Sequence, residues 1–271
     1  MTPITNPPLH HSTNHQSPIL STFSLTAGYK RARDIIRGIN VVIEEGEFVG
    51  LFGTNGAGKS TVLKAIMGLL YQKEGQILYY PGNGASSMDI IKHSADMRSR
   101  MGIKYLTQDA RIFPNFTVKD NLMFAVNYDN NAYEQRIERI FTLFPDMGEN
   151  SFLKKKGDDL SGGQREKTAI AMVLITEPRL LMLDEPSSGL SPNIVGALLK
   201  GIRDFQKSRD GKMGIILIEQ QKLFDAKNIC DSLYLMKNGS VVDLEGNISR
   251  EKLKADSISE EDLERFMLVE A

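Results

Sequence analysis

The segment from Gly53 to Thr61 carries residue types suited to binding phosphate groups. It fits the pattern G-x-x-x-x-G-K-[ST], with an apolar strand pattern before it and a helical pattern after it. Glycines let the backbone curl so that its N–H groups, with the N-terminus of the following helix, form a cradle for an anion. Lys59 would supply a positive charge to the outer phosphates, and Ser60 a hydroxyl ligand for Mg²⁺. The predicted phosphate-binding residues are Gly53, Thr54, Asn55, Gly56, Ala57, Gly58, Lys59, Ser60 and Thr61.

Two carboxylates follow an apolar stretch much later in the chain. Leu180–Leu183 reads as a buried strand and leads directly into Asp184, Glu185 and Pro186. Asp184 at the end of a strand can reach a metal ion, whereas Glu185 points elsewhere because neighbouring side chains in a strand alternate. We therefore predict Asp184 as a ligand of Mg²⁺ and Glu185 as the general base for an attacking water.

Apolar patterns place both groups on an alternation of strands and helices. Gly58–Leu70 and Ile194–Phe205 have helical periodicity, and this alternation predicts a parallel sheet with helices on its faces. The strand-like stretches are Leu20–Leu25, Ile39–Ile43, Phe48–Phe52, Gln76–Tyr80, Ile103–Leu106, Leu180–Leu183, Met213–Ile218 and Ser232–Met236.

The remaining segments differ in character. Residues 1–17 hold almost no large apolar residues and predict a disordered tail; a metal site at His10, His11 and His15 is the less favoured alternative. Asn115–Leu160 has periods near 3.6 and predicts an inserted helical subdomain. Ser257–Val269 predicts an amphipathic helix, with Ser259 as its cap.

Bulk properties narrow the class of protein. A formal net charge of −1 gives no general attraction to nucleic acid, so no nucleic-acid partner is predicted. The single cysteine, Cys230, forms no internal disulfide and is interpreted as a buried hydrophobic residue rather than a reactive thiol. No apolar run reaches the roughly 20 residues that span a bilayer, so any work at a membrane requires another polypeptide.

A third motif, Leu160-Ser161-Gly162-Gly163-Gln164, resembles the signature sequence of ATP-binding-cassette ATPases. The resemblance extends from about Ile19 to about Asp243. It implies ATP hydrolysis with ATP and Mg²⁺ on an α/β fold: a RecA-type P-loop core with a parallel sheet and flanking helices, an antiparallel β subdomain and an inserted α-helical subdomain. The expected division is a disordered tail at 1–18, a nucleotide-binding domain at 19–245 with helices inserted at about 109–165, and a C-terminal helical extension at 246–271.

The resemblance also implies roles for single residues. Tyr29 would stack on adenine, the alternative being ordinary packing at a strand end. Gln108 would contact Mg²⁺ and sense a membrane partner. The site would be completed by a second ATPase subunit in a head-to-tail ATP sandwich, joined through the loop at residues 188–191. Ser161 and Gly163 would face the γ-phosphate bound by the opposite subunit, and Gly162 between them is also predicted to bind the nucleotide.

One departure from the family pattern indicates which subfamily the chain resembles. None of the four histidines follows Glu185, and Gln220 stands where the family has a histidine. A glutamine orients water or a phosphate but carries no proton, so the predicted catalytic set is Glu185, Gln220 and Lys59. The pair Glu219-Gln220 is similar to the ATP-binding subunits of branched-chain amino acid, amide and urea importers. Because only one of the two ATPases there often keeps the histidine, we expect a non-identical partner subunit.

These features predict an ATP-hydrolysing subunit that powers transport of a small solute through separate membrane permease subunits, with a solute-binding protein as an indirect partner. Its expected place is the cytoplasmic face of the inner membrane, as a peripheral protein. A soluble scaffold ATPase and the ATPase of a lipid or polysaccharide exporter are the alternatives. The apolar segment of Phe113, Pro114 and Phe116 is either a docking site for a membrane subunit or internal packing. Lys154–Lys156 is interpreted as a solvated loop rather than a lipid contact.

Overall fold

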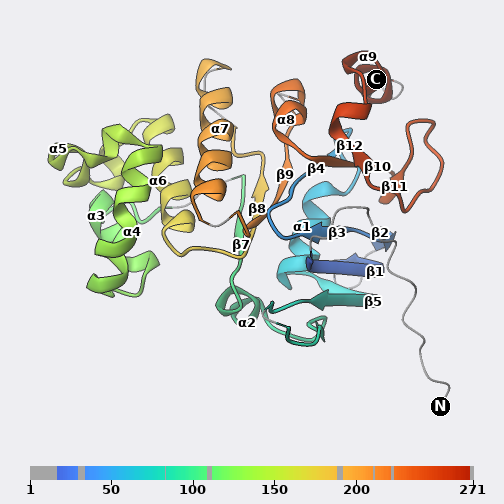
Figure 1. Ribbon diagram of the computed structural model, residues 1–271, viewed down its shortest axis with the longest axis horizontal. Coiled ribbons are helices and arrows are strands. Elements are labelled where there is room, and N and C mark those ends of the chain that lie inside the picture. The colour runs from blue at the N-terminus through green and yellow to red at the C-terminus, as the bar shows by residue number, and fades with distance from the viewer. Residues whose placement is uncertain are drawn as a thin grey trace.

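The computed structural model describes residues 17–29, 34–82, 84–108, 112–187, 192–209, 211–220 and 223–268. The chain forms a RecA-like P-loop core, an antiparallel β subdomain and a helical subdomain (Figure 1). The predicted disordered tail and the predicted joining loop at residues 188–191 lie outside the described residues, apart from the last one or two positions of the tail.

The central sheet has the strand order β11-β10-β4-β9-β8-β7 among the described residues, and β12 pairs with β10. From β10 to β7 every pairing is parallel, whereas β11 and β12 run antiparallel to β10. The strands predicted for this part of the chain needed only small changes at their ends. The strands are β4 (Phe48–Gly53), β7 (Ile103–Leu106), β8 (Leu180–Asp184), β9 (Gly214–Ile218), β10 (Ser232–Lys237), β11 (Ser240–Val242) and β12 (Leu253–Lys254).

A second, antiparallel sheet is built around the long strand β1. Its members are β1 (Pro18–Gly28), β2 (Asp34–Ile39), β3 (Val42–Glu44), β5 (Tyr71–Tyr79) and β6 (Met88–Asp89).

The single strand predicted at Ile39–Ile43 is wrong, because β2 ends at Ile39 and β3 begins at Val42. The buried Thr22 of β1 explains the break. Its hydroxyl donates to the Ile39 carbonyl at 3.0 Å and accepts from the Val41 N–H at 3.0 Å. A side chain therefore replaces some of the backbone hydrogen bonds between strands at this point.

The helices lie on the faces and ends of the sheets (Figure 1). They are α1 (Lys59–Met67), α2 (Ala95–Arg100), α7 (Pro192–Ser208), α8 (Leu223–Ile229) and α9 (Glu260–Leu268), with a 3₁₀ turn, η3, at Ala255–Ser257. Ser259 caps α9 as predicted, since its Oγ accepts from the Asp262 N–H at 3.0 Å. Within the described part of the chain, no helix has the length and apolar character needed to cross a bilayer.

Helix α1 is shorter than the predicted Gly58–Leu70. Gly68, at φ 80°, ends it in the left-handed conformation that glycine adopts readily. The fully buried Arg98 of α2 then donates to the Ala65 and Ile66 carbonyls at 2.9 and 2.6 Å. A guanidinium at the negative end of the helix dipole stabilises α1 and ties α2 to it.

The helical subdomain comprises α3 (Val118–Ala125), α4 (Asn130–Leu143), α5 (Asn150–Leu153) and α6 (Gly162–Leu174), with 3₁₀ turns η1 (Pro145–Gly148) and η2 (Gly157–Asp159). Three of these helices begin at side-chain caps, namely Thr117, Asp129 and Ser161, and the first and last form capping boxes. Local sequence therefore sets where these helices start.

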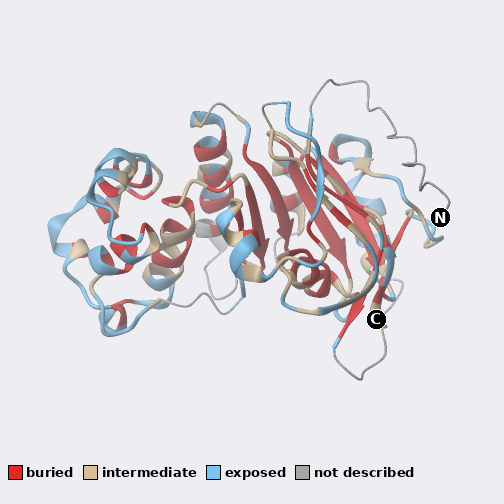
Figure 2. Ribbon diagram, turned by 90° about the horizontal axis from the view of Figure 1, so that it is seen from below, coloured by how far each residue is buried: buried red, intermediate tan, exposed pale blue. Residues whose placement is uncertain are grey.

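The parallel sheet divides the core into two layers (Figure 2). Phe48, Leu181 and Ile215 face a cluster that includes α3, α4, α6 and α7, whereas the next residues along the strands face α1 and the antiparallel sheet. Alternate side chains of a strand point to opposite faces, so a sheet buried on both sides has apolar residues at every position.

The base of β4 is anchored by a buried ion pair. Glu47, only 7% exposed, accepts from Lys252 Nζ at 2.8 Å through each carboxylate oxygen and from Ser232 Oγ at 2.6 Å. Lys252 lies in the stretch between β11 and β12, so this pair joins the last part of the chain to the strand that leads into the phosphate loop.

We predict that Lys252→Met lowers the free energy of unfolding by about 3 kcal/mol, because it leaves the Glu47 carboxylate buried without its cation. Urea unfolding followed by far-ultraviolet circular dichroism measures this change. The matched control is Arg100→Met, which breaks the exposed pair with Asp96 (side chains 80% and 69% exposed) and should cost less than about 0.5 kcal/mol. Equal losses in the two variants would contradict the anchoring role.

Candidate functional site

The loop between β4 and α1 depends on two glycines in left-handed conformations. Gly53 has φ 157° and Gly58 φ 100°. A Cβ atom at Gly53 would lie 2.2 Å from the Met236 carbonyl oxygen, and one at Gly58 would lie 2.9 Å from Ile36 Cγ2. The backbone therefore passes too close to its neighbours for any other residue, and the loop curls as a phosphate cradle requires.

Helix α1 starts without the capping side chain seen on its neighbours. Its N-cap, Gly58, makes no side-chain hydrogen bond, and the first turn holds no acidic residue. The first N–H groups of α1 are thus left to an anion, and the positive end of the helix dipole favours one. The predicted residues from Gly53 to Thr61 therefore fit the phosphates of a nucleotide.

The Lys59 side chain is folded back over the loop. It is 4% exposed, and its Nζ donates to the carbonyls of Gly53 at 2.7 Å and Thr54 at 2.8 Å. Burial lowers the pKa of Lys59, while the nearby carboxylates of Glu185 and Asp184 oppose that shift. The predicted cation and both predicted acids thus share one electrostatic environment.

Asp184, only 4% exposed, is held through both of its carboxylate oxygens. Oδ1 accepts from Ser60 Oγ at 2.9 Å, and Oδ2 accepts from the Tyr105 hydroxyl at 2.7 Å. No sequence pattern identified Tyr105 as a residue of the site. Burial, and then the bond to Asp184, raise the pKa of Tyr105 well above its usual range, so its hydroxyl stays a donor.

The hydroxyl of Ser60 and the carboxylate of Asp184 are oxygen ligands of the kind Mg²⁺ prefers. Across the described residues, no group of three or more His, Cys, Asp or Glu side chains is placed to hold a metal. Mg²⁺ is commonly held by one or two protein oxygens together with nucleotide phosphates, and this pair of ligands fits that arrangement.

Glu185 leaves the end of β8 in an unusual conformation. Its φ of 52° is rare for a residue other than glycine and is more often found at functional sites. The carboxylate accepts from Gln108 Nε2 at 3.0 Å and from the side chain of Gln220. Burial, followed by the charges of Asp184 and Glu219, raises the pKa of Glu185, which favours its action as a base.

Two further residues near the site, Glu219 and Ser187, carry no sequence signal of their role. The fully buried Glu219 accepts from Ser187 Oγ at 2.5 Å and from the Gln220 N–H at 2.8 Å. Glu219 therefore connects the segment after Asp184 to the segment that carries Gln220. No local pattern reveals this contact, since 32 positions separate Glu219 from Ser187.

The remaining predicted residues lie on exposed surface. Tyr29, at the end of β1, is 49% exposed and makes a small contribution to the raised pKa of Tyr105. Ser161 and Gly162 are exposed at the start of α6, with Gly163 partly exposed behind them. Helix α6 belongs to the helical subdomain and lies apart from α1 (Figure 1).

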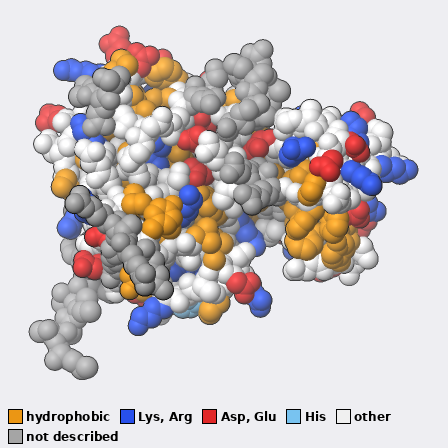
Figure 3. All heavy atoms as spheres, turned by 180° about the vertical axis from the view of Figure 1, so that it is seen from behind, with side chains coloured by type: hydrophobic (Ala, Val, Ile, Leu, Met, Phe, Trp, Pro, Cys, Tyr) orange, Lys and Arg blue, Asp and Glu red, His pale blue; other side chains and the backbone are white. Residues whose placement is uncertain are grey.

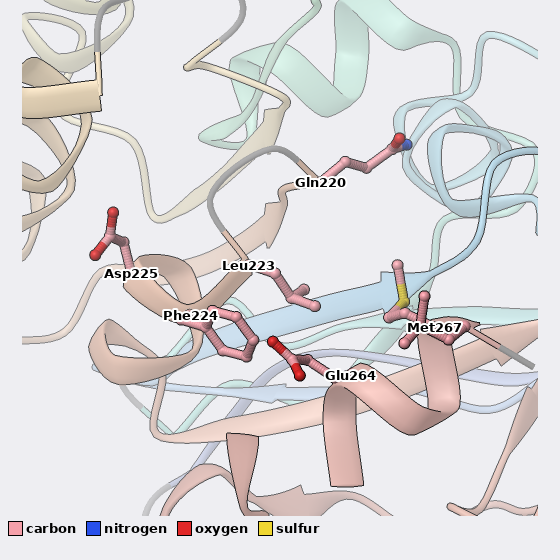
Figure 4. Close-up of a pocket in the computed structure, with 7 residues that line it drawn as sticks. Gln220, Leu223, Phe224, Asp225, Glu264 and Met267 are labelled. Atoms are coloured by element: carbon pink, nitrogen blue, oxygen red, sulfur yellow. The ribbon is translucent and has the colours of Figure 1, made fainter. Parts of the chain in front are cut away.

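A shallow hollow of about 600 Å³ lies beside the site, between α8 and α9. Leu223, Phe224, Glu264 and Met267 gather on one side of it, whereas the amide of Gln220 lies apart from them (Figure 4). Gln220 thus forms the boundary between this hollow and the group around Glu185.

The sequence and the fold are both similar to those of known proteins. A sequence-family model described as "ABC transporter" matches residues 36–188. The probable branched-chain amino acid transport ATP-binding protein LivF of Archaeoglobus fulgidus is 35% identical over 224 residues, covering 82% of this chain and 90% of that protein. The lipopolysaccharide export system ATP-binding protein LptB of Acidithiobacillus ferridurans is 31% identical over 226 residues, covering 83% and 89%. The solved structure of cbiO1 from Clostridium perfringens, part of the ABC transporter complex cbiONQ, aligns with a TM-score of 0.72 at 27% identity and covers 92% of this chain and 93% of that one.

We predict that Glu166, on α6 five residues after Ser161, makes stability depend on pH. Burial raises its pKa from 4.5 to about 7, so folding favours the protonated form. That contribution is complete below pH 4.5 and is lost as the pH rises to about 7. The free energy of unfolding of Glu166→Gln, measured relative to that of the unmodified protein, should therefore rise from pH 5 to pH 8. We expect a rise of about 1 kcal/mol, after allowance for solvent screening. Urea unfolding at the two pH values measures this, and a difference independent of pH would contradict it.

Proposed function

Because the chain belongs to the ABC transporter family and is an ATP-hydrolysing subunit of it, we propose that it powers uptake of an amino acid, amide or urea-like solute through separate membrane subunits. The observation that carries the proposal is the convergence of Ser60, Gln108 and Gln220 on the neighbouring carboxylates Asp184 and Glu185. The Glu219-Gln220 pair and the 35% identity to LivF favour an amino-acid-like solute.

Export of a lipid or polysaccharide is the second candidate. It is favoured by the 31% identity to LptB, which is close to the value for LivF. Uptake of radiolabelled amino acids by vesicles that contain the whole transporter, against release of lipid from them, separates the two candidates.

In the proposed domain division, residues 1–18 form a tail and residues 19–245 the nucleotide-binding domain, with helices inserted at about 109–165. Residues 246–271 form a C-terminal helical extension, to which α9 belongs. The Glu47–Lys252 pair supports a firmly attached extension, because it joins that segment to β4.

ATP would lie across the phosphate loop, with its phosphates on the first N–H groups of α1 and adenine on the exposed ring of Tyr29. Lys59 would exchange the carbonyls of Gly53 and Thr54 for phosphate oxygens. This exchange replaces neutral acceptors with charged ones, so the ammonium group would then form hydrogen bonds within an ion pair.

Ser60, Asp184 and Gln108 are the proposed protein ligands for Mg²⁺, Asp184 acting directly or through water. When bound, Mg²⁺ offsets negative charge on the phosphate oxygens. Ser60 and Asp184 are already joined at 2.9 Å, so both oxygens lie at one point beside the loop.

Glu185 is the proposed general base. It would accept a proton from the attacking water as the new bond to the γ-phosphorus forms and the bond to the bridging oxygen of ADP breaks, giving ADP and inorganic phosphate. Gln108 and Gln220 both hydrogen-bond Glu185 and would keep its carboxylate aimed at the water. Gln220 orients these groups but takes no proton.

Cassettes of this family function as dimers with membrane permease subunits. We propose a head-to-tail ATP sandwich in which Ser161, Gly162 and Gly163 contact the γ-phosphate bound to the other subunit. Their exposure at the N-terminus of α6 supports this role, because N–H groups there favour an anion. Gln220 in place of the histidine supports a non-identical partner ATPase.

An aromatic patch on the helical subdomain is the proposed docking surface for the membrane subunits. A solute-binding protein would deliver solute to those membrane subunits. The rings of the patch are partly exposed and in mutual contact, with centroids 4.5–6.3 Å apart, and hydrophobic side chains gather on this subdomain in Figure 3. Exposed apolar patches of this kind mark interaction sites. The proposed location is peripheral, on the cytoplasmic face of the inner membrane. The patch comprises Phe113, Phe116, Phe124 and Tyr128.

We expect Glu185→Gln to lower ATPase activity by about two orders of magnitude, because it removes a positioned general base but keeps the shape of the side chain. Steady-state phosphate release, with and without the partner ATPase, measures the effect. Binding of ATP should persist in the variant, since Glu185 is not among the proposed nucleotide-binding residues.

Full activity of Glu185→Gln would exclude Glu185 as the base. If only the mixed dimer hydrolyses ATP and the variant behaves as the unmodified chain, the catalytic site belongs to the partner subunit.

Phe113→Ser should weaken association with the membrane subunits by about tenfold or more, because a buried aromatic anchor contributes about 2 kcal/mol to an interface. Co-purification from a mild detergent extract measures the association. The control is Ile248→Ser at a site 83% exposed and outside the aromatic patch, where no change is expected. Unchanged association of Phe113→Ser would remove the patch as the docking surface.

A further inference from the structure

The hydroxyl of Tyr105 donates a hydrogen bond to one of the two carboxylate oxygens of Asp184. The bond to Oδ2 measures 2.7 Å, and Ser60 occupies Oδ1 at 2.9 Å. With Asp184 only 4% exposed, water does not readily take the place of either donor. Two fixed donors on two oxygens leave the carboxylate a single orientation.

Strand pairing explains how Tyr105 reaches this position. Strand β7 runs parallel to β8, with Tyr105 opposite Met182. The Asp184 side chain is two residues farther along β8 than that of Met182, and therefore on the same face of the sheet. The long phenol ring spans this offset, which a shorter hydroxyl residue would not.

The segment that directly follows strand β7 supplies the donor for the next carboxylate. Three residues after Tyr105, Gln108 donates to Glu185 at 3.0 Å. The two contacts differ in burial, because Asp184 is buried whereas Gln108 is exposed. Tyr105 thus holds the buried carboxylate of Asp184, and Gln108, which is exposed to solvent, holds the carboxylate of Glu185.

We propose that Tyr105 is a positioning residue that fixes the Asp184 carboxylate in the orientation required to bind Mg²⁺. The proposal rests on the proposed function, in which Asp184 is a ligand of Mg²⁺. Tyr105 acts through Asp184 and touches neither the metal nor the nucleotide. Hydrogen-bond partners of this kind orient metal ligands, and their loss commonly lowers metal affinity by about 10- to 100-fold.

The test is Tyr105→Phe, which removes the hydroxyl and keeps the ring. A fluorescent, non-hydrolysable ATP analogue is titrated into the purified full chain in EDTA, and then at fixed analogue concentration with increasing Mg²⁺. We expect an unchanged affinity in EDTA and a half-saturating Mg²⁺ concentration raised about tenfold. These are binding measurements, so they do not depend on turnover.

The matched control is Tyr79→Phe, because the Tyr79 hydroxyl donates to the Met101 carbonyl at 2.7 Å, away from both carboxylates. It should leave the Mg²⁺ dependence unchanged. Unchanged Mg²⁺ dependence in Tyr105→Phe would overturn the proposal, and so would an equal loss of affinity in EDTA, which indicates a packing role.

A second variant, Asp184→Asn, distinguishes failure of the Tyr105 proposal from failure of the proposed function. If Asp184→Asn raises the Mg²⁺ requirement and Tyr105→Phe does not, Asp184 binds Mg²⁺ without help from Tyr105. If neither variant alters the Mg²⁺ requirement, the assignment of Asp184 as a metal ligand fails, and the positioning role fails with it.

Discussion

The paired hydrogen bonds on Asp184 join three segments that lie far apart in the sequence. Ser60 is 124 positions before Asp184 and Tyr105 is 79 positions before it, yet both hydroxyls lie within 2.9 Å of its oxygens. This contact therefore links the start of α1 and the end of β7 to the end of β8. It connects the phosphate loop to the strand that carries both carboxylates.

The contact is possible because the strands run parallel and end at one edge of the sheet. Gly53, Asp184 and Ile218 end their strands at this edge, so the polar segments that follow them meet there. The central strands β4, β8 and β9 are almost wholly apolar between their ends, since helices and the second sheet cover both faces. In these three strands the polar residues follow the apolar run, and that contrast makes the phosphate loop and the Asp184-Glu185 pair recognisable from the amino-acid sequence alone.

Much of the fold could be predicted for the same reason, and the rest depends on contacts without a local pattern. The helical insertion, the parallel strands and the Ser259 cap follow from periodicity and capping residues. The break between β2 and β3 depends on Thr22, a side chain from another strand. Tyr105 looks like an ordinary strand residue in the sequence, and Glu219 is noticed there only as part of the Glu219-Gln220 pair, so only their contacts reveal what they hold.

The folded-back Lys59 has a consequence for ligand choice. Its ammonium group donates to two backbone carbonyls of its own loop, which helps to hold that loop in its curled shape. An incoming anion must compete with these internal acceptors. A single weakly charged group gains little from the exchange, whereas a polyphosphate replaces both carbonyls and also reaches the N–H groups of α1. The loop's own backbone thus acts as a competing internal acceptor, which favours polyphosphates over small, weakly charged anions.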